Sequence, residues 1–478
     1  MKLAEAIREY HSILLSLWGH QRDEVSKFEE KDYRALFFEM GAGKTRTSIA
    51  GWLQKVLLNK RILQTIIFCP KIMIEGWKRE IEGLLPLDFA KIIVPLEGSG
   101  PGRIKRLKLS KEPRIYITNL EALGMKDFME ALHKKAIEFV VFDESHKLKD
   151  PKGVRSKAAI KLADTCRYKQ ILTGSPILND YIDIWSQFRI LNKHLLGDNF
   201  FKWRLNNFYN ANADKTWLSF PAWTIKPESL PKIERLVREN AGVALKKDVM
   251  KFLPPIVRKE IYVDLLPSLA KNYKEMEKHF VTEIEGEVMS ADIVIVKMLR
   301  LQQLCCGIVT NDEKETKSVI TGKHEALKEL LDDLCPHSKV IVWANFKQCI
   351  SDVKDICDEI GLYYTVIEGG QSNAERQEQV DNFNNLKIYS VCIANQQAGG
   401  VGIGLQAASY MIYFSKDYRL ESDIQSEARA HRGGSEIHQC ITRIDLLTKG
   451  TIEEDIHQAL REKGKLGDII RGVKDRWK

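Results

Sequence analysis

The segment Gly41–Thr45 has the residue types and spacing of a loop that binds phosphate. It follows an apolar run that ends at Phe38, and it precedes a segment, Arg46–Leu58, whose pattern predicts a helix. In such a strand, turn and helix, backbone N–H groups point at a polyphosphate, Lys44 neutralises the β- and γ-phosphates, and the Thr45 hydroxyl can ligate Mg²⁺. The strict pattern has a glycine where Phe38 stands, so a glycine-rich turn without a ligand is the alternative.

A pair of acidic residues follows another apolar run. The run Val140–Phe142 ends at Asp143 and Glu144. Because ligands of α/β proteins bind at the carboxyl ends of parallel strands, these carboxylates are candidates for the same ligand site. We expect Asp143 to hold Mg²⁺ through water and Glu144 to polarise the water that attacks a phosphate. An acidic loop without a ligand is the alternative interpretation.

Two arginines late in the chain form the third candidate. Arg429 and Arg432 are three residues apart, so a helix through both would present their guanidinium groups on one face. Such a pair suits the charge that develops on a γ-phosphate. These arginines could meet the phosphate loop only if the second half of the chain docked against the first. A solvated basic helix face is the alternative.

Two further loops follow predicted strands. Thr173–Pro176 places hydroxyl groups in a turn, and on its own it is more typical of a plain turn than of a site. Gly399–Gly404 is dense in glycine, so its backbone can approach a nucleotide or a nucleic-acid backbone closely. A flexible loop is an equally good interpretation of this second segment.

The alternation of short apolar runs with longer amphipathic segments predicts an α/β fold in two halves. Continuous apolar strands separated by helices are typical of a parallel sheet covered on both faces. Residues 1–190 and 321–478 show this pattern, whereas residues 191–320 are largely helical in periodicity and contain the best linker candidate, Pro254-Pro255. The predicted strands are Thr65–Cys69, Arg114–Thr118, Phe139–Phe142, Gln170–Leu172, Lys339–Trp343, Tyr363–Val366, Ser390–Ile393 and Tyr410–Phe414.

Composition limits the partners and the compartment. The 478 residues carry a net charge of +8, which permits a polyanionic partner without requiring one. The nine cysteines show no spacing typical of a zinc site or a disulfide framework. The N-terminal residues do not read as a signal peptide, and no apolar run is long enough to span a membrane, so we expect a cytosolic or nuclear protein.

Two clusters admit more than one interpretation. The aromatic residues between 200 and 223 are expected to form the core of a helical insertion, and base stacking is the alternative. The basic stretch Arg103–Lys108 could add to a nucleic-acid track, and a solvated loop is an equally good interpretation.

In their order along the chain, these motifs resemble those of the superfamily-two helicase-like ATPases, and within them the Swi/Snf-type double-stranded DNA translocases. Phe68–Lys71 with Trp77–Glu80 is similar to a segment that contacts a nucleic-acid backbone in that family, and Gly19–Arg22 is similar to its glutamine motif, which reads adenine. The chain departs from the family in three loops: Ser175 stands where a threonine is usual and keeps the hydroxyl, Gly404 stands where an asparagine is usual, and Lys416–Arg419 replaces Asp-Trp-Asn-Pro.

The resemblance implies two RecA-like lobes with a largely helical insertion between them, and ATP with Mg²⁺ as the bound nucleotide. It assigns Mg²⁺ to Thr45 and Asp143, water activation to Glu144, and charge stabilisation to Arg429 and Arg432. The residues that it implies for ATP binding are Gln21, Gly41, Gly43, Lys44, Thr45 and Gln425.

The resemblance further implies a DNA partner, most consistent with double-stranded DNA bound without sequence preference. Binding through phosphates would be steeply salt-dependent. The expected form is a minimal, monomeric motor without accessory domains and without a membrane partner. A strand-separating helicase and a DNA-binding scaffold that does not hydrolyse ATP are the alternatives.

Overall fold

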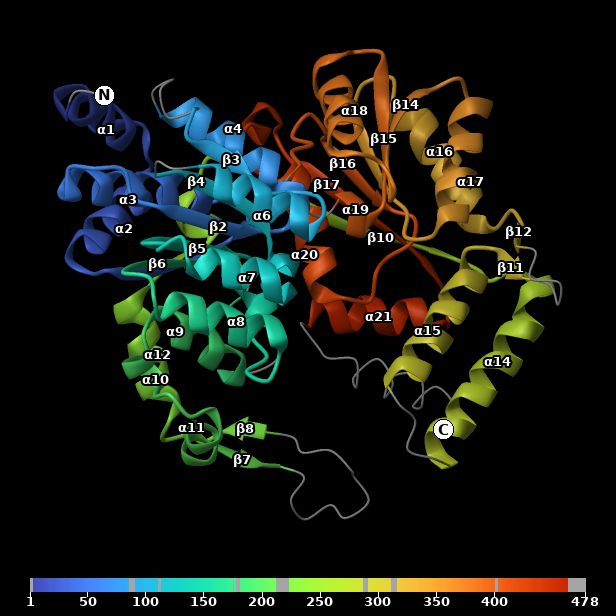
Figure 1. Cartoon of the computed structure of the whole chain (residues 1–478). Coiled ribbons are helices and arrows are strands. Elements are labelled where there is room, and N and C mark those ends of the chain that lie inside the picture. Colours follow the sequence, from blue (N-terminus) through green and yellow to red (C-terminus); the bar gives the residue numbers. More distant parts are fainter. Residues whose placement is uncertain are drawn as a thin grey trace. The chain divides into compact units, whose positions relative to one another are not determined.

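The computed structural model describes residues 3–85, 91–110, 113–174, 176–177, 181–211, 223–286, 291–310, 316–399 and 403–462. It divides into two compact units, Met1–Lys251 and Phe252–Lys478, each with its own parallel sheet (Figure 1). The expected α/β fold with two parallel-sheet lobes is therefore confirmed. The predicted linker Pro254-Pro255 lies just after the boundary, and the region 191–320 is divided between the two units.

The sheet of the first unit has the order β3-β4-β2-β5-β6-β1-β9, and all its neighbouring strands are parallel. The apolar runs of β2, β4 and β5 are buried along their whole length, as expected for strands covered on both faces. The strands are β1 (Tyr33–Phe38), β2 (Thr65–Cys69), β3 (Ile93–Pro95), β4 (Ile115–Asn119), β5 (Phe139–Asp143), β6 (Tyr168–Leu172) and β9 (Ala241–Ala244).

Helices cover both faces of this sheet. On one face Phe68 packs in a core cluster with Phe128 of α7 and Phe188 of α9, and on the other Ile67 lines a small apolar pocket with Trp77 of α4. The helices are α1 (Leu3–Ser16), α2 (Gly19–Glu30), α3 (Lys44–Asn59), α4 (Ile74–Leu84), α6 (Gly100–Leu109), α7 (Lys126–His133), α8 (Val154–Ala163), α9 (Ile184–Leu191), α10 (Lys193–Leu196), α11 (Phe200–Asn207), α12 (Leu230–Asn240) and α13 (Lys246–Val249), with 3-10 turns at Lys71–Met73, Leu120–Gly124, Ser145–Leu148 and Tyr181–Asp183.

The aromatic cluster belongs mainly to the core. Phe200, Trp203 and Phe208 are buried and join the same cluster as the sheet residues, next to the small antiparallel pair β7 (Phe208–Asn210) and β8 (Trp223–Ile225). The expectation of a core is confirmed for these three residues. Phe201 is 50% exposed, and Trp217 and Phe220 lie outside the described residues.

The basic stretch Arg103–Lys108 lies in helix α6, so the alternative interpretation is wrong about a loop, although Lys105, Arg106 and Lys108 are exposed. Arg103 points into the protein, where its guanidinium donates hydrogen bonds to Thr118 Oγ1 and Asn119 Oδ1. The Arg103 guanidinium therefore stabilises the fold. A contribution of the exposed Lys105 and Lys108 to a nucleic-acid track stays a prediction.

The second unit has a sheet of order β10-β17-β16-β13-β15-β14, again with parallel neighbours, and a separate antiparallel pair, β11 (Ile308–Thr310) with β12 (Thr316–Ser318). Its strands are β10 (Ile256–Val263), β13 (Val340–Trp343), β14 (Tyr363–Ile367), β15 (Tyr389–Ala394), β16 (Tyr410–Tyr413) and β17 (Ile441–Thr448). Its helices are α14 (Pro267–Gly286), α15 (Ala291–Cys305), α16 (Gly322–Leu334), α17 (Lys347–Glu359), α18 (Asn373–Asn385), α19 (Gln396–Gly399), α20 (Leu420–Ala430) and α21 (Ile452–Arg461), with a 3-10 turn at Ser435–Ile437.

The predicted strands are all present, with ends that differ by at most a few residues. The eight-residue strands β10 and β17 were not predicted. β17 is buried throughout, yet it carries Arg443 and Asp445, which broke the apolar pattern. Inside the protein these two side chains form an ion pair with each other.

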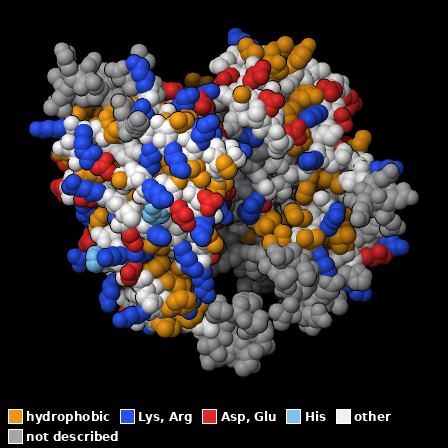
Figure 2. Space-filling view, viewed as in Figure 1, with side chains coloured by type: hydrophobic (Ala, Val, Ile, Leu, Met, Phe, Trp, Pro, Cys, Tyr) orange, Lys and Arg blue, Asp and Glu red, His pale blue; other side chains and the backbone are white. Residues whose placement is uncertain are grey.

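The structure bears on the expectations about cysteines, membrane-spanning helices and surface charge. All nine cysteines are free, and among the described residues no group of three or more His, Cys, Asp or Glu could hold a metal ion. Within the same residues, no helix combines the length and apolar character that crossing a membrane requires. Figure 2 shows Lys and Arg side chains spread over the viewed face among acidic and apolar ones.

Candidate nucleotide site

The phosphate loop joins the end of β1 to the start of α3. Gly41 and Gly43 have φ of 84° and 83°, a left-handed conformation that favours glycine. Helix α3 begins at Lys44, two residues earlier than predicted, so Thr45 lies in its first turn. The turn thus directs the N-terminus of a sixteen-residue helix at the carboxyl edge of the sheet, where an anion is stabilised.

Phe38, which occupies the position of the expected glycine, is the last residue of β1, and its side chain is buried. The Phe38 carbonyl accepts a hydrogen bond of 2.9 Å from Lys44 Nζ. A strand residue therefore fits this position, because the turn itself begins only after Phe38. The mismatch with the strict pattern does not disturb the loop.

The first turn of α2, which contains His20 and Gln21, packs directly on the loop. Gln21 Nε2 donates to the Gly43 carbonyl at 3.2 Å, and Gln21 Oε1 accepts from the Trp18 backbone N–H at 2.7 Å. His20 Nε2 lies 3.0 Å from the Ala42 carbonyl oxygen. A Cβ atom added at Gly43 would lie 1.9 Å from Gln21 Nε2, so any other residue at this position would displace the Gln21 side chain. The structure thus joins Gln21 to the loop backbone, and adenine recognition by Gln21 stays a prediction.

Asp143 and Glu144 are buried at the end of β5, on the same edge of the parallel sheet as the phosphate loop. Asp143 Oδ2 accepts a hydrogen bond of 2.9 Å from Trp77 Nε1, and Asp143 Oδ1 accepts one of 2.9 Å from the Glu144 backbone N–H. Glu144 has a φ of 51°, which is uncommon for a residue with a side chain. A strained conformation at this position is typical of functional sites.

A buried chain of polar groups continues from Glu144. His146 Nδ1 lies 3.3 Å from Glu144 Oε2 and 2.9 Å from Thr173 Oγ1. Thr173 follows β6, and its backbone N–H donates to the Leu36 carbonyl of β1. The predicted Thr173–Pro176 turn is therefore joined to the acidic pair through its first residue; Ser175 lies outside the described residues.

The charges of this cluster influence one another. Burial, followed by the charge of Glu144, raises the pKa of Asp143. Burial also acts to raise the pKa of Glu144, but the hydrogen bond from His146 and the charge of Lys44 outweigh it, so this pKa is lowered. The charge of Lys44 also acts to lower the pKa of Asp143, as expected for a lysine at the same edge of the sheet.

The oxygen donors of this edge fit Mg²⁺, which prefers hydroxyl, carboxylate, water and phosphate oxygens. Asp143 receives one hydrogen bond on each oxygen, so each oxygen keeps a lone pair for a ligand. Thr45 supplies a half-buried hydroxyl in the first turn of α3. These two residues are the ones that would hold the metal.

In the second unit, Arg429 and Arg432 meet at one backbone carbonyl. Arg429 Nη1 donates to the Ile403 carbonyl at 3.2 Å, and Arg432 Nη1 donates to it at 3.1 Å. Helix α20 ends at Ala430, so the predicted single helix through both arginines is wrong. The backbone beyond the helix still brings the two guanidinium groups together, beside the end of the glycine loop, whose residues 400–402 lie outside the described part.

The helix that carries Arg429 is anchored by a residue that sequence reasoning missed. Arg443 of β17 is buried and donates to both carboxylate oxygens of Asp423, at 3.0 and 2.7 Å, and to Glu427 at 3.1 Å. Both acids lie on α20. Gln425, on the same helix, is buried and donates to Glu421 Oε1 at 2.8 Å, and its predicted contact with nucleotide stays a prediction.

A phosphate loop, a buried acidic pair at the same sheet edge and a second parallel-sheet unit with paired arginines define the class of nucleotide-binding, helicase-like α/β proteins. Comparison with family models agrees with this class. The SNF2-related domain matches residues 29–308, and the helicase conserved C-terminal domain matches residues 322–434. Since the first match covers more than half of the chain, the protein belongs to the SNF2-related family.

Several curated proteins are similar over nearly the whole chain. An uncharacterized ATP-dependent helicase of Mycoplasma pneumoniae is 28% identical over 95% of this chain and 42% of its own length. The ISWI chromatin-remodeling complex ATPase ISW2 of Saccharomyces cerevisiae is 25% identical over 93% of this chain and 40% of its own. The human DNA repair and recombination protein RAD54B is 25% identical over 90% of this chain and 51% of its own length. The chain thus spans about half of these relatives or less.

Among solved structures, the SWI2/SNF2 ATPase core of Sulfolobus solfataricus in complex with dsDNA is 22% identical in sequence. The match covers 96% of this chain and 94% of that chain, with a TM-score of 0.44.

Proposed function

We propose that the protein is an ATP-dependent motor that hydrolyses ATP when it binds double-stranded DNA. The observation that supports this most directly is the position of Lys44, Asp143 and Glu144 at one edge of the same parallel sheet, because it brings a phosphate loop to the side of the sheet that carries the two carboxylates that hydrolysis needs. Membership of the SNF2-related family adds support, as do relatives named for ATP-dependent helicase, chromatin-remodeling ATPase and DNA repair and recombination.

In this proposal, the loop backbone of Gly41 and Gly43 and the ammonium group of Lys44 bind the phosphates of ATP. Thr45 and Asp143 would hold Mg²⁺, which would supply positive charge to neutralise the phosphates of ATP. The lowered pKa of Glu144 keeps its carboxylate charged at neutral pH, so that it can accept a hydrogen bond from the attacking water and orient it.

The remaining site residues complete the proposal. Gln21 and Gln425 contact the nucleotide, and Arg429 and Arg432 stabilise the charge that develops on the γ-phosphate. An arginine in this role typically contributes on the order of 10³–10⁵ in turnover. The convergence of both guanidinium groups on the Ile403 carbonyl supports their action as a pair.

DNA is proposed as the polyanion that stimulates hydrolysis. Contacts with phosphates would make binding independent of base sequence and steeply dependent on salt. A strand-separating helicase of the same superfamily remains the second candidate, because both types of enzyme share these motifs. A scaffold without hydrolysis is disfavoured, because Lys44, Asp143 and Glu144 are all present and clustered.

The test is ATP hydrolysis measured in parallel with double-stranded DNA, single-stranded DNA, forked DNA and RNA. We expect the largest stimulation with double-stranded DNA. Lys44→Ala removes the phosphate charge partner and Glu144→Gln removes the water-orienting carboxylate, so each should lower DNA-stimulated turnover by about 10² or more. Glu130→Gln, at an exposed position of α7, is the matched control and should behave like the unaltered protein.

Two outcomes would refute parts of the proposal. Turnover retained in Glu144→Gln, with thermal unfolding unchanged, would remove the assigned role of Glu144. Unwinding of a labelled duplex without displacement of a triplex-forming strand would favour the strand-separating helicase over the translocase.

A further inference from the structure

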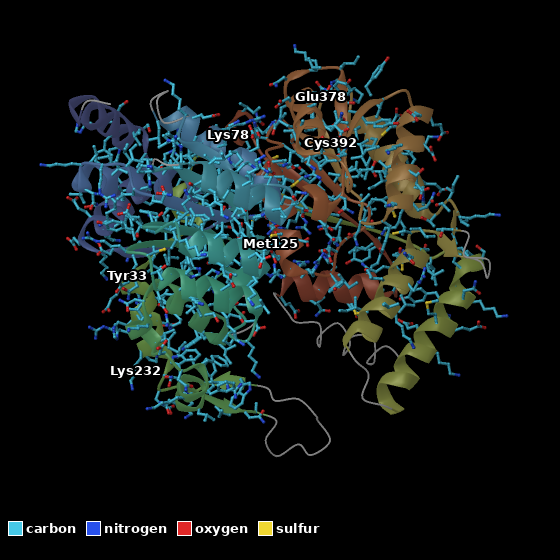
Figure 3. All side chains as sticks on the ribbon, viewed as in Figure 1. Tyr33, Lys78, Met125, Lys232, Glu378 and Cys392 are labelled. Carbon is cyan, nitrogen blue, oxygen red and sulfur yellow. The ribbon has the colours of Figure 1, made fainter. Side chains whose placement is uncertain are left out.

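Trp77 is hydrogen-bonded to a carboxylate of the proposed site. Its indole N–H donates to Asp143 Oδ2 at 2.9 Å, and both residues are buried. Trp77 lies on α4, next to Lys78, which is labelled in Figure 3. Indole nitrogen can only donate a hydrogen bond, so this contact favours an Asp143 oxygen that acts as acceptor.

The indole ring has little freedom to move. Trp77 is 1% exposed and lines the apolar pocket between α3, α4 and the sheet, together with Ile67 and Val141. Burial to this extent restricts the rotamers that a large ring can adopt. The N–H group is therefore fixed in position by the core, and it fixes Asp143 Oδ2 in turn.

Asp143 is held on both oxygens. Oδ1 accepts a hydrogen bond of 2.9 Å from the backbone N–H of Glu144, and within the described part of the chain Oδ2 accepts one from the indole N–H alone. With two donors at these distances, the plane of the carboxylate cannot rotate without losing a hydrogen bond. Loss of a group that orients a metal-binding side chain in this way typically costs about 10–100-fold in metal affinity.

From this geometry we infer that Trp77 is a positioning residue, which orients the Asp143 carboxylate for Mg²⁺ at the proposed nucleotide site. The inference rests on the proposed function. Packing alone would be served by any large apolar side chain, but only the indole N–H can hold Oδ2. Removal of this N–H should therefore weaken the effect of Mg²⁺ on nucleotide binding more than nucleotide binding itself.

The chain offers a matched control in Trp52. This residue is also buried, lines the same pocket, and donates its indole N–H to Thr65 Oγ1 at 2.8 Å. Trp52→Phe removes an equivalent buried hydrogen bond without touching Asp143. A difference between Trp77→Phe and Trp52→Phe therefore reports on Asp143 and not on the loss of a buried indole.

The experiment measures the affinity of a fluorescent ADP analogue for the full chain, with MgCl₂ and with EDTA. The readout is the factor by which Mg²⁺ tightens binding. In Trp77→Phe we expect this factor to fall by about tenfold or more, with the affinity in EDTA unchanged. In Trp52→Phe we expect the factor of the unaltered protein. Thermal unfolding checks that each variant is folded.

If Trp77→Phe does not fold, incorporation of β-(3-benzothienyl)alanine at position 77 keeps the ring shape and removes only the N–H. The inference is overturned if either Trp77 variant keeps the full Mg²⁺ factor, or if the affinity in EDTA falls by as much as the affinity with Mg²⁺. Failure of the proposed function is a different result, since the unaltered protein would then bind the analogue in neither condition.

Discussion

Replacement of Gly43 by alanine should destabilise the first unit through two separate effects. An alanine at the observed φ of 83° costs about 1–2 kcal/mol. The new Cβ would also lie 1.9 Å from Gln21 Nε2, so the Gln21 side chain must move and lose its hydrogen bonds to the Gly43 carbonyl and the Trp18 N–H. At about 1 kcal/mol for each hydrogen bond, the expected total is about 3–4 kcal/mol.

The assay is denaturant unfolding of four proteins: the unaltered chain, Gly43→Ala, Gln21→Ala and the double variant. Gln21→Ala alone should cost about 2 kcal/mol, because both hydrogen bonds are lost. In the Gln21→Ala background the obstacle is gone, so Gly43→Ala should cost only about 1–2 kcal/mol. Gly361→Ala provides the control, since Gly361 has a φ of 70° and nothing within 4 Å of an added Cβ.

The reasoning is refuted if Gly43→Ala costs the same free energy of unfolding with and without Gln21. That result would show that the loop yields without displacing this side chain. A cost for Gly43→Ala no larger than that for Gly361→Ala would lead to the same conclusion.

Two more predictions concern pH and the aromatic cluster. In the second unit, burial acts to raise the pKa of Asp445, but the charges of Lys416 and Arg443 outweigh it, so the pKa is lowered from 3.8 to about 2. The Asp445 carboxylate should therefore add about 2 kcal/mol to the free energy of unfolding above pH 4, and this contribution should be lost as the pH falls towards 2. Acid unfolding, followed by circular dichroism, should accordingly be less steep in Asp445→Asn. In the first unit, Trp203→Ala should lower the free energy of unfolding by about 3–5 kcal/mol, because Trp203 is buried in the core. Phe201→Ala should lower it by clearly less, because Phe201 is 50% exposed. Equal losses in denaturant unfolding would contradict the assignment of Trp203 to the core and Phe201 to the surface.

The parts of the molecule that were predictable from the sequence depend on residues close together in the chain. The phosphate loop and the acidic pair each follow an apolar strand directly, so their place at the carboxyl edge of the sheet follows from local pattern. The strand Thr65–Cys69 was predicted with its observed ends, because a continuous apolar run bounded by polar residues or Pro70 leaves little choice.

The parts that were not predictable depend on pairing between distant residues. Trp77 and Asp143 are 66 positions apart, and no local pattern says which carboxylate an indole will meet. Arg103 lies in a basic stretch for which a solvated loop was one interpretation, yet its guanidinium is buried and donates hydrogen bonds to Thr118 and Asn119. The strand β17 was not predicted, because its sequence contains the charged residues Arg443 and Asp445. Their partners, Asp423 for Arg443 and Lys416 for Asp445, lie elsewhere in the chain.

The edge strand β10 begins directly after Pro255 and pairs in parallel with β17 over eight residues, from Ile256 to Val263. The ladder is extended at both ends, because the Pro255 carbonyl accepts from Ile441 N and the Val263 carbonyl accepts from Lys449 N. A pull along the chain at residue 255 therefore runs parallel to the strand, and the hydrogen bonds of the ladder share the load in shear. The start of the second unit should therefore resist tension, because many hydrogen bonds between β10 and β17 must break together before the two strands separate.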